Sequence, residues 1–397
     1  MNQDKELYKS NIKKAYIYKF LQSFNFLSAI LIPFFTLWGG LNFKQIMILQ
    51  AIFTFSIFLL EIPTGVLADK LGRKVSLSLA GLATAIGFLI YASYPNFWIF
   101  ALGEFILAIS ASLISGADQA MVYDSLREIK KEKQSKKIFG RFNSIGLLAL
   151  MVAAPIGSLI AKYFGLRAVM LAMLFPNLIM FIFALTFKEP EIGRKISKKR
   201  SYLKTFKRGF SYFRCHKILR IMAIDYISIS TLAFFLIWVY QVKLQALNID
   251  IGKFGFVHSA IVIVQILVLN TFVKFEKLFG GKKKYLFYSA ILTGAGFIII
   301  GLAQSFVIVI LGILLAAAFG LTRKPLFNSY MNKYITSNER ATVLSTISMF
   351  YMLTMAVIDI ILGYFVDLNL AYTLVAVGLI IIGLSIISKI EEEYLID

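Results

Sequence analysis

Long apolar segments recur along this chain of 397 residues, and they constrain its fold more than any other feature. At about 1.5 Å of rise per residue, roughly 20 apolar residues let a helix cross about 30 Å of bilayer hydrocarbon. Because 59% of the residues are hydrophobic, the chain has more apolar side chains than a soluble globule of its size can bury. The sequence therefore predicts an all-α integral membrane protein with twelve transmembrane helices, at 15–38, 44–68, 76–94, 97–121, 139–161, 166–187, 218–242, 254–275, 285–304, 306–322, 342–366 and 369–388.

The N-terminal segment predicts a retained first transmembrane helix. Residues 1–14 are mostly polar, and the apolar run that follows is too long for the core of a signal peptide and has no small-residue cleavage site.

Basic residues indicate the orientation of the chain in the membrane. The predicted loops place 36 lysines and arginines on the side of the N-terminus and 5 on the other side, with Lys19 inside the first helix near enough to the inner surface to snorkel. Both termini are therefore expected to be cytoplasmic, in a multi-pass protein of the inner membrane. The net charge of +21 is then mostly a topology signal, aided by anionic lipid headgroups, and gives no support to nucleic-acid binding.

The residues that hold metals and cofactors are scarce. Cys215 is the single cysteine, and His216 and His258 lie far apart in sequence. We expect no disulfide, no metal and no cofactor. The missing P-loop argues against ATP hydrolysis. A membrane-embedded enzyme would need a nucleophile and base or a metal cluster, so carboxylates alone leave only a remote enzymatic alternative. A transporter-like sensor is equally remote.

A basic linker divides the chain into two halves. We expect domains at 1–187 and 218–397 with a cytoplasmic linker at 188–217. The linker aromatics recur at three- and four-residue spacing among lysines and arginines, which predicts an amphipathic helix at the membrane surface; a solvated linker is the alternative. These aromatics are Tyr202, Phe206, Phe210 and Phe213.

GVLADKLGRK (65–74) after the second segment is echoed by KFEKLFGGKKK (274–284) after the eighth, which indicates a duplicated six-helix unit.

The stretch GVLADKLGRK resembles the loop signature G-x-x-x-D-R-x-G-R-K of the major facilitator superfamily, with Lys70 in place of the usual arginine. The matching residues are Gly65, Asp69, Gly72, Arg73 and Lys74. Together with YDSL (123–126) and NERATVLS (338–345), it is similar to a bacterial branch related to drug:proton antiporters. The resemblance covers essentially the whole chain. It implies two pseudo-symmetric six-helix bundles, in a protein that we expect to be a monomer.

The residues of this loop predict a gating element. Gly65 permits close helix approach, Gly72 permits the turn, and Asp69 can pair with Arg73 four residues on. Asp124, at the inner end of helix 4, is a further partner for Arg73, and we expect Glu61 to act in gating. The resemblance implies that Asp69 faces the start of helix 11, which carries Ser337, Asn338 and Glu339. A sharp inner turn that only obeys the positive-inside rule is the alternative.

Helix 5 carries a partial match to a motif of antiporter branches. Ala154 to Leu159 resembles G-P-x-x-G-G, in which Pro155 matches outright. Ala154, Ser158 and Leu159 replace the glycines of the motif, and Gly157 falls at a variable position. Small residues around a proline permit tight packing and a bend, so the match favours export only weakly and generic packing is as good an explanation.

Carboxylates within the predicted helices are the candidates for proton coupling. Charged groups in hydrocarbon cost at least about 2.5–3.5 kcal/mol on insertion scales and usually face a cavity or a partner. The candidates are Asp225, Glu104, Asp118 and Asp359, of which we favour the first two. The resemblance places helices 1, 4, 7 and 10 around the central cavity. Glu104 stands where many drug antiporters carry an arginine, so the role of that arginine does not transfer. The alternative is a carboxylate paired to a neighbouring helix with no part in transport.

Neutral polar residues offer a cavity lining. Gln22, Asn25, Gln241 and Gln265 lie within predicted helices, where each serves as readily in a helix-packing hydrogen bond. The function expected from the whole chain is proton-coupled efflux of small hydrophobic or amphipathic compounds by alternating access. Proton-coupled uptake of a small metabolite or siderophore-like compound is the alternative.

Overall fold

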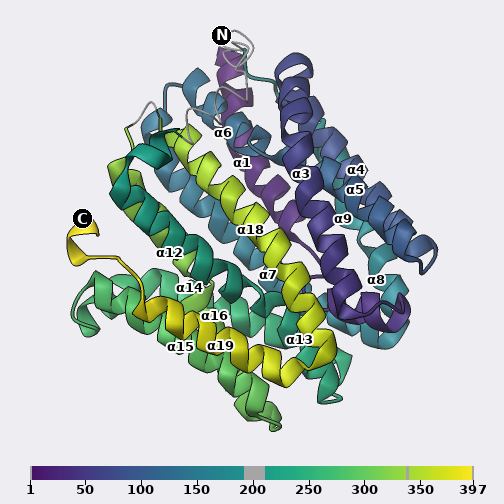
Figure 1. Cartoon of the computed structure of the whole chain (residues 1–397). Coiled ribbons are helices and arrows are strands. Elements are labelled where there is room, and N and C mark those ends of the chain that lie inside the picture. The colour runs from purple at the N-terminus through teal and green to yellow at the C-terminus, as the bar shows by residue number, and fades with distance from the viewer. Residues whose placement is uncertain (1, 192–210, 337–338, 396–397) are drawn as a thin grey trace. The chain divides into compact units, whose positions relative to one another are not determined.

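The computed structural model describes residues 2–191, 211–336 and 339–395, and all regular secondary structure in these residues is helical (Figure 1). Ten helical stretches among them are long and apolar enough to cross a membrane, and Leu370–Ile386 is a shorter apolar helix. The α-helices are α1 (Asn2–Ser23), α2 (Leu31–Pro33), α3 (Phe43–Leu71), α4 (Arg73–Ser93), α5 (Phe97–Ile114), α6 (Ala117–Glu128), α7 (Ser135–Phe164), α8 (Leu166–Ala172), α9 (Leu174–Ala184), α12 (Lys217–Phe234), α13 (Leu236–Ala246), α14 (Phe254–Leu278), α15 (Lys282–Leu302), α16 (Phe306–Gly320), α17 (Arg323–Met331), α18 (Arg340–Leu368) and α19 (Leu370–Ile386). This arrangement confirms the all-α membrane class.

Three predicted helices differ from the observed ones, and one of them, 97–121, ends too early because α6 continues to Glu128. The stretch 15–38 is not one helix, because α1 ends at Ser23, turns occupy the next residues, and a π-helical turn follows at Phe34–Trp38. The stretch 306–322 is too short, because the chain resumes as α17 immediately after Thr322. The sequence did not predict this continuation because the polar residues RKP (323–325) resemble the beginning of a loop.

Interrupted helices are a feature of five of the spans. The stretches that correspond to the predicted first, fourth, sixth, seventh and tenth helices each consist of more than one helical piece. In the fourth, Gly116 adopts a φ of +75° between α5 and α6. The carbonyls near this break are satisfied by hydroxyls: Thr64 Oγ1 donates to Ser112 O at 3.2 Å and Ser76 Oγ donates to Leu113 O at 2.7 Å. Such substitutes are required because the bilayer offers no water to an unpaired backbone group.

The chain forms two compact units. Unit 1 contains residues 1–41, 48–199 and 250–259. In it α4 packs against α5 and α9, and α1 packs against α6 and α7. Its core includes Tyr18, Met121, Phe142 and Phe187, which are all nearly inaccessible. This packing fixes the depth of the charged residues that α1 and α6 carry.

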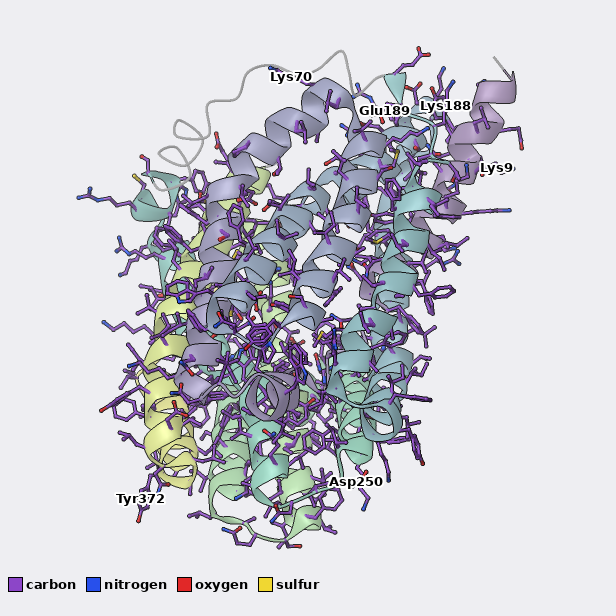
Figure 2. All side chains as sticks on the ribbon, turned by 90° about the vertical axis from the view of Figure 1, so that its right-hand side faces the viewer. Lys9, Lys70, Lys188, Glu189, Asp250 and Tyr372 are labelled. Carbon is purple, nitrogen blue, oxygen red and sulfur yellow. The ribbon has the colours of Figure 1, made fainter. Side chains whose placement is uncertain are left out.

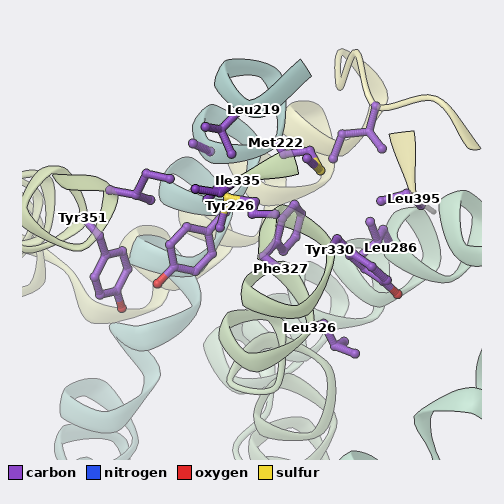
Figure 3. Close-up of a cluster of buried hydrophobic side chains, with 14 of the residues drawn as sticks. Leu219, Met222, Tyr226, Leu286, Leu326, Phe327, Tyr330, Ile335, Tyr351 and Leu395 are labelled. Carbon is purple, nitrogen blue, oxygen red and sulfur yellow. The ribbon is translucent and has the colours of Figure 1, made fainter. Parts of the chain in front are cut away.

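Unit 2 contains residues 42–47, 200–249 and 260–397. Here α15 packs against α16 and α19, while α12 lies against α17, α18 and α19. Figure 3 shows part of its core, where the Tyr226 ring stacks on Tyr351 with centroids 5.4 Å apart and also contacts Phe327. Of the linker aromatics, Phe213 packs against this core. Tyr202, Phe206 and Phe210 lie outside the described residues, as does most of the predicted amphipathic helix.

Candidate functional site

The turn between α3 and α4 is closed by a carboxylate that the sequence did not suggest. Glu189, which follows α9, accepts hydrogen bonds from the backbone N–H groups of Arg73 and Lys74, both at 2.8 Å. Gly72 has a φ of +96°, and a Cβ on it would lie 2.8 Å from Cδ of Glu189. A glycine is therefore needed for both the backbone conformation and the space. The carboxylate also lies at the positive end of α4.

The second half repeats this device with other residues. Glu392, which follows α19, accepts from the N–H groups of Lys282 at 2.8 Å and Lys283 at 2.7 Å, at the start of α15. Gly281 has a φ of +131°, and its Cβ would lie 3.1 Å from the Glu392 carboxylate. The sequence echo at 274–284 thus corresponds to a structural repeat of the turn.

Arg73 has the partner that the sequence suggested. Its guanidinium forms an ion pair with Asp124 of α6, and Nη1 donates to Ala120 O at 3.1 Å. Gly65 lies within α3, and Lys74 lies in the first turn of α4. The side chain of Asp69, together with Ser337 and Asn338, lies outside the described residues. Within unit 1, Figure 2 labels Lys9, Lys70 and Glu189 at one end and Asp250 at the opposite end.

A first ion pair within the spans joins α1 to α6. Lys19 Nζ lies 3.9 Å from Asp118 Oδ2 and donates to Gln22 Oε1 at 2.9 Å. Lys19 also lies over the ring of Phe142, 5.2 Å from its centroid. Lys19 is thus held inside unit 1, and the snorkelling that its sequence position suggested is not needed.

A second ion pair joins α12 to α17. Arg323 Nη2 lies 2.8 Å from Asp225 Oδ1, and both side chains are less than 10% exposed. Arg323 Nη1 donates to Leu286 O and to Ser289 Oγ of α15, and Ser388 Oγ donates to Asp225 Oδ2 at 2.6 Å. The two pairs have opposite polarity: the predicted first helix of one half carries the cation, and the predicted seventh helix carries the anion.

Two carboxylates have only neutral partners among the described residues. Glu104 of α5 is 3% exposed, accepts from Gln50 Nε2 at 2.8 Å and is hydrogen-bonded to Tyr91. Asp359 of α18 is 2% exposed and faces the indole of Trp238, and its Oδ1 has no hydrogen-bond partner in the described part of the chain. Neither carboxylate has an ion pair there, so a charge on either is uncompensated.

Glu61 lies near the break between α5 and α6. Its carboxylate interacts with the Ser115 hydroxyl, at the residue before Gly116. This contact joins α3 to the break in the fourth span, and a gating role for Glu61 stays a prediction.

The helix 5 motif is tightly packed inside unit 1. A Cβ on Gly157 would lie 1.9 Å from Phe26 O, so nothing larger than glycine fits there. A Cβ on Gly255 would lie 2.2 Å from Ala154 O, beside Pro155. Ser158 Oγ bonds to Gly252 O at 3.0 Å. The motif residues therefore make a close helix contact, which is the packing explanation that the sequence left open.

An ion pair lies at the far end of α7. Lys162 Nζ is 3.1 Å from Asp250 Oδ2, and Asp250 Oδ1 accepts from Gly252 N at 2.9 Å. Hydrogen bonding to Lys162 is the main cause that lowers the pKa of the Asp250 carboxyl, with the Gly252 amide and the charge of Lys253 adding to it.

The predicted cavity residues bond largely within their own segments. Gln241 and Gln265 donate to the carbonyls of Ile237 and Ile261, four residues earlier. Asn25 Oδ1 accepts from Leu27 N at 2.8 Å and so supports the turn after α1. These bonds leave a ligand role for the three residues a prediction.

Sequence reasoning missed the partners of the candidate carboxylates. Gln50, Tyr91 and Trp238 carry no charge and give no signal, whereas Arg323 was placed in a loop by the early end of the tenth helix. Glu189 and Glu392 follow the sixth and twelfth helices in KEPE (188–191) and EEEY (391–394), a repeated signal that could have revealed them. In the described residues, no cluster of three or more His, Cys, Asp and Glu could hold a metal.

Apolar spans that are interrupted within the membrane and carry buried ionisable groups define a polytopic helical membrane protein of the kind that moves solutes. Residues 20–357 match the family description Major Facilitator Superfamily. The chain belongs to this family of transporters.

Known relatives agree at the level of family and fold. An uncharacterized transporter of Buchnera aphidicola subsp. Acyrthosiphon pisum (strain APS) is 26% identical over 239 residues, which are 60% of this chain and 57% of that relative. The match therefore spans a little over half of the relative's length. The nucleoside transporter NupG has a TM-score of 0.76 at 16% identity and covers 96% of both chains. A POT family transporter in complex with a thioalcohol-conjugated peptide has a TM-score of 0.73 at 14% identity, over 95% of this chain and 94% of the other. At these identities the two structures show the fold alone.

Proposed function

We propose that this transporter is a proton-coupled exporter of small hydrophobic or amphipathic compounds, working by alternating access. The environment of Glu104 is the observation that supports proton coupling. Its carboxylate is buried in a membrane span and has only neutral hydrogen-bond donors around it. A proton bound there removes a charge that the bilayer penalises, and its release restores that charge. The protonation state of Glu104 is then linked to whether water reaches it.

Asp225 would couple protonation to movement in a different way. A proton on Asp225 weakens the ion pair with Arg323, whose guanidinium would be left uncompensated in the membrane. Relief of this charge requires α12 and α17 to change their contacts. The pair at Lys19 and Asp118 offers the same type of switch in the other half. Asp359 joins Glu104 as a second proton site with neutral surroundings.

Export is supported by the overall resemblance to drug:proton antiporters, whereas the small-residue motif around Pro155 adds little because its residues make a close helix contact. Uptake of a small metabolite or siderophore-like compound is the alternative. Because a nucleoside transporter and a peptide transporter share the fold, nucleosides and peptides belong in any substrate screen together with dyes and drugs.

Reconstitution into liposomes with an imposed pH gradient tests the proposal. We expect one class of compound to trigger proton movement, and Glu104→Gln, which keeps the size of the side chain and an oxygen that accepts from Gln50 but has no titratable group, to reduce that movement at least about tenfold. Asp225→Asn should reduce it as well. Glu132→Gln removes a partly exposed carboxylate from the segment between α6 and α7 and serves as the matched control. Unchanged proton movement in both Glu104→Gln and Asp225→Asn would refute the coupling. The direction of the substrate gradient that drives protons distinguishes export from uptake.

A further inference from the structure

An apolar cavity of about 740 Å³ lies within unit 2, between α12, α18 and α19. Its volume falls in the range of about 300–1,000 Å³ that is typical of small-molecule sites. Its lining residues include no Asp, Glu, Lys or Arg. Figure 1 shows the origin of the space, since α18 and α19 meet at one end and diverge from there. We call this cavity the α18–α19 groove.

The groove has a buried floor and an open apolar mouth. Val377 and Leu362 of the floor are 0% and 8% exposed, whereas Phe365 and Ile380 of the mouth are 49% and 50% exposed. Exposed apolar side chains on membrane-spanning helices are matched by hydrocarbon rather than by water. The mouth therefore fits an opening toward the bilayer.

The apolar length of the groove matches one leaflet. On α18 the apolar lining runs from Ile358 to Leu368, about 15 Å at 1.5 Å per residue, which is half of about 30 Å of hydrocarbon. Beyond Ile358 the lining includes the hydroxyls of Ser228, Thr231 and Thr354 beside the apolar side chains of Leu232 and Leu384. These hydroxyls mark the deep end at which an alkyl chain would stop.

The other end of the groove carries the residues of a membrane interface. Asn369 and Tyr372 line it where α18 gives way to α19, and tyrosine is enriched at the level of lipid headgroups. Nearby, Asp367 accepts from the backbone N–H groups of Phe43 and Lys44 at 2.9 and 2.8 Å, which fixes Lys44 beside α18. The Lys44 ammonium lies 5.4 Å from the centroid of the Tyr364 ring and is exposed. A cation at this level attracts a lipid phosphate.

We propose that the α18–α19 groove is a binding site for one phospholipid of the bilayer, with an acyl chain in the groove and the phosphate near Lys44. The lipid would fill the groove that residues of α12, α18 and α19 line. Its presence would support the position of α18, the helix that carries Asp359. This site is independent of the identity of the transported compound.

Photocrosslinking on the unmodified full-length protein is the first test. The protein is reconstituted with a phosphatidylethanolamine that carries a diazirine at the end of one acyl chain, and labelled peptides are mapped by mass spectrometry. We expect labels on α12 near Thr231 and on α18 near Thr354, at the deep end. Labelling spread evenly over all bilayer-facing helices would overturn the proposal.

Native mass spectrometry of delipidated protein is the second test. We expect one phospholipid to remain on the unmodified protein, and Ala376→Phe, which fills the groove from α19, to reduce its occupancy at least about tenfold. Leu379→Phe is the matched control, because this residue is exposed on the same helix but outside the lining. Lys44→Gln should weaken retention of the phospholipid but should still allow the acyl chain to enter the α18–α19 groove. Equal loss in Ala376→Phe and Leu379→Phe, or displacement of the lipid by a transported compound, would show that the groove is no lipid site. Neither readout requires transport, so failure here is separate from failure of the proposed function.

Discussion

Arg323 is 1% exposed, and groups from two neighbouring helices hold its guanidinium: Asp225 of α12, and Leu286 and Ser289 of α15. The bonds fix the rotamer of a long side chain, so the pair specifies one register between α12 and α17. Its net contribution to stability is small or even negative, because desolvation offsets the attraction. Such a pair affects the stability of the protein most when one of its two members is removed alone.

Arg323→Met should destabilise the protein by about 3–5 kcal/mol, because it leaves a buried carboxylate without a counter-charge. The measurement is unfolding in detergent, followed by thermal melting or denaturant titration. The double variant Asp225→Asn with Arg323→Met should recover part of the loss. If the double variant is less stable than Arg323→Met, the two residues do not act as a pair.

Asp250→Asn tests the ion pair with Lys162 through its pH dependence. Because the pKa of Asp250 is lowered in the folded protein, the pair contributes stability above the ordinary Asp pKa of about 3.9, and this contribution is lost as the pH falls through the folded-state pKa. The melting temperature of Asp250→Asn should therefore lie below that of the unmodified protein at neutral pH and converge with it in acid. Asparagine can still accept the Gly252 N–H bond, so loss of the turn is controlled for. A difference that grows as the pH falls would contradict the assignment.

At the scale of elements, two helices begin with the same construction. A carboxylate from the segment after the last helix of each half bonds the first two free N–H groups of α4 or α15, next to a glycine with positive φ. Four N–H groups at a helix start have no intrahelical partner, so each carboxylate meets half of that need. It also places a negative charge at the favourable end of the helix dipole.

Gly72→Ala should lower stability more than Gly165→Ala does. The two glycines share nearly the same backbone conformation, φ +96° and ψ 158° against φ +88° and ψ 163°. Both variants carry strain of about 1–3 kcal/mol. Only Gly72 lies against Glu189, because a Cβ on Gly165 has nothing within 4 Å. The expected excess for Gly72→Ala is about 1 kcal/mol or more, read from unfolding in detergent, and it should disappear in a Glu189→Ala background. Equal losses would mean that Glu189 tolerates the methyl group.

Sequence reasoning located helices well and side-chain partners poorly, for physical reasons. The span 139–161 was predicted within four residues of α7, because hydrocarbon thickness fixes the length of an apolar run. The breaks at Gly116 and Phe235 were not predicted, because their support comes from other helices. The pairing of Arg73 with Asp124 followed from the loop motif, whereas the pairing of Glu104 with Gln50 joins neutral and charged residues 54 positions apart and leaves no local trace.

At the scale of the whole molecule, twelve crossings with both termini in the cytoplasm remain a prediction from the charge distribution. The predicted loops alternate between strongly basic and nearly uncharged, so a single missed or added crossing would reverse the charge bias of every later loop. Exposed positions before α12 and after α13 should lie on opposite sides of the membrane if these two helices form one crossing.

Cys215 gives a direct test of this topology, because it is the single cysteine and is exposed. A membrane-impermeant maleimide should label Cys215 in inverted vesicles but not in intact cells with a permeabilised outer barrier. Asn248→Cys in a Cys215→Ser background should show the reverse pattern. Labelling of both positions from the same side would exclude a single crossing by α12 and α13.

The repeated carboxylate turn has a consequence for how the protein could be made. Glu189 lies at the start of the predicted linker and Glu392 near the end of the second half, so each half closes the start of α4 or α15 with its own chain. Neither half borrows this closure from the other. Two separately translated polypeptides, divided after Glu191, would each retain it, and such a split gene is a route to labelling one half at a time.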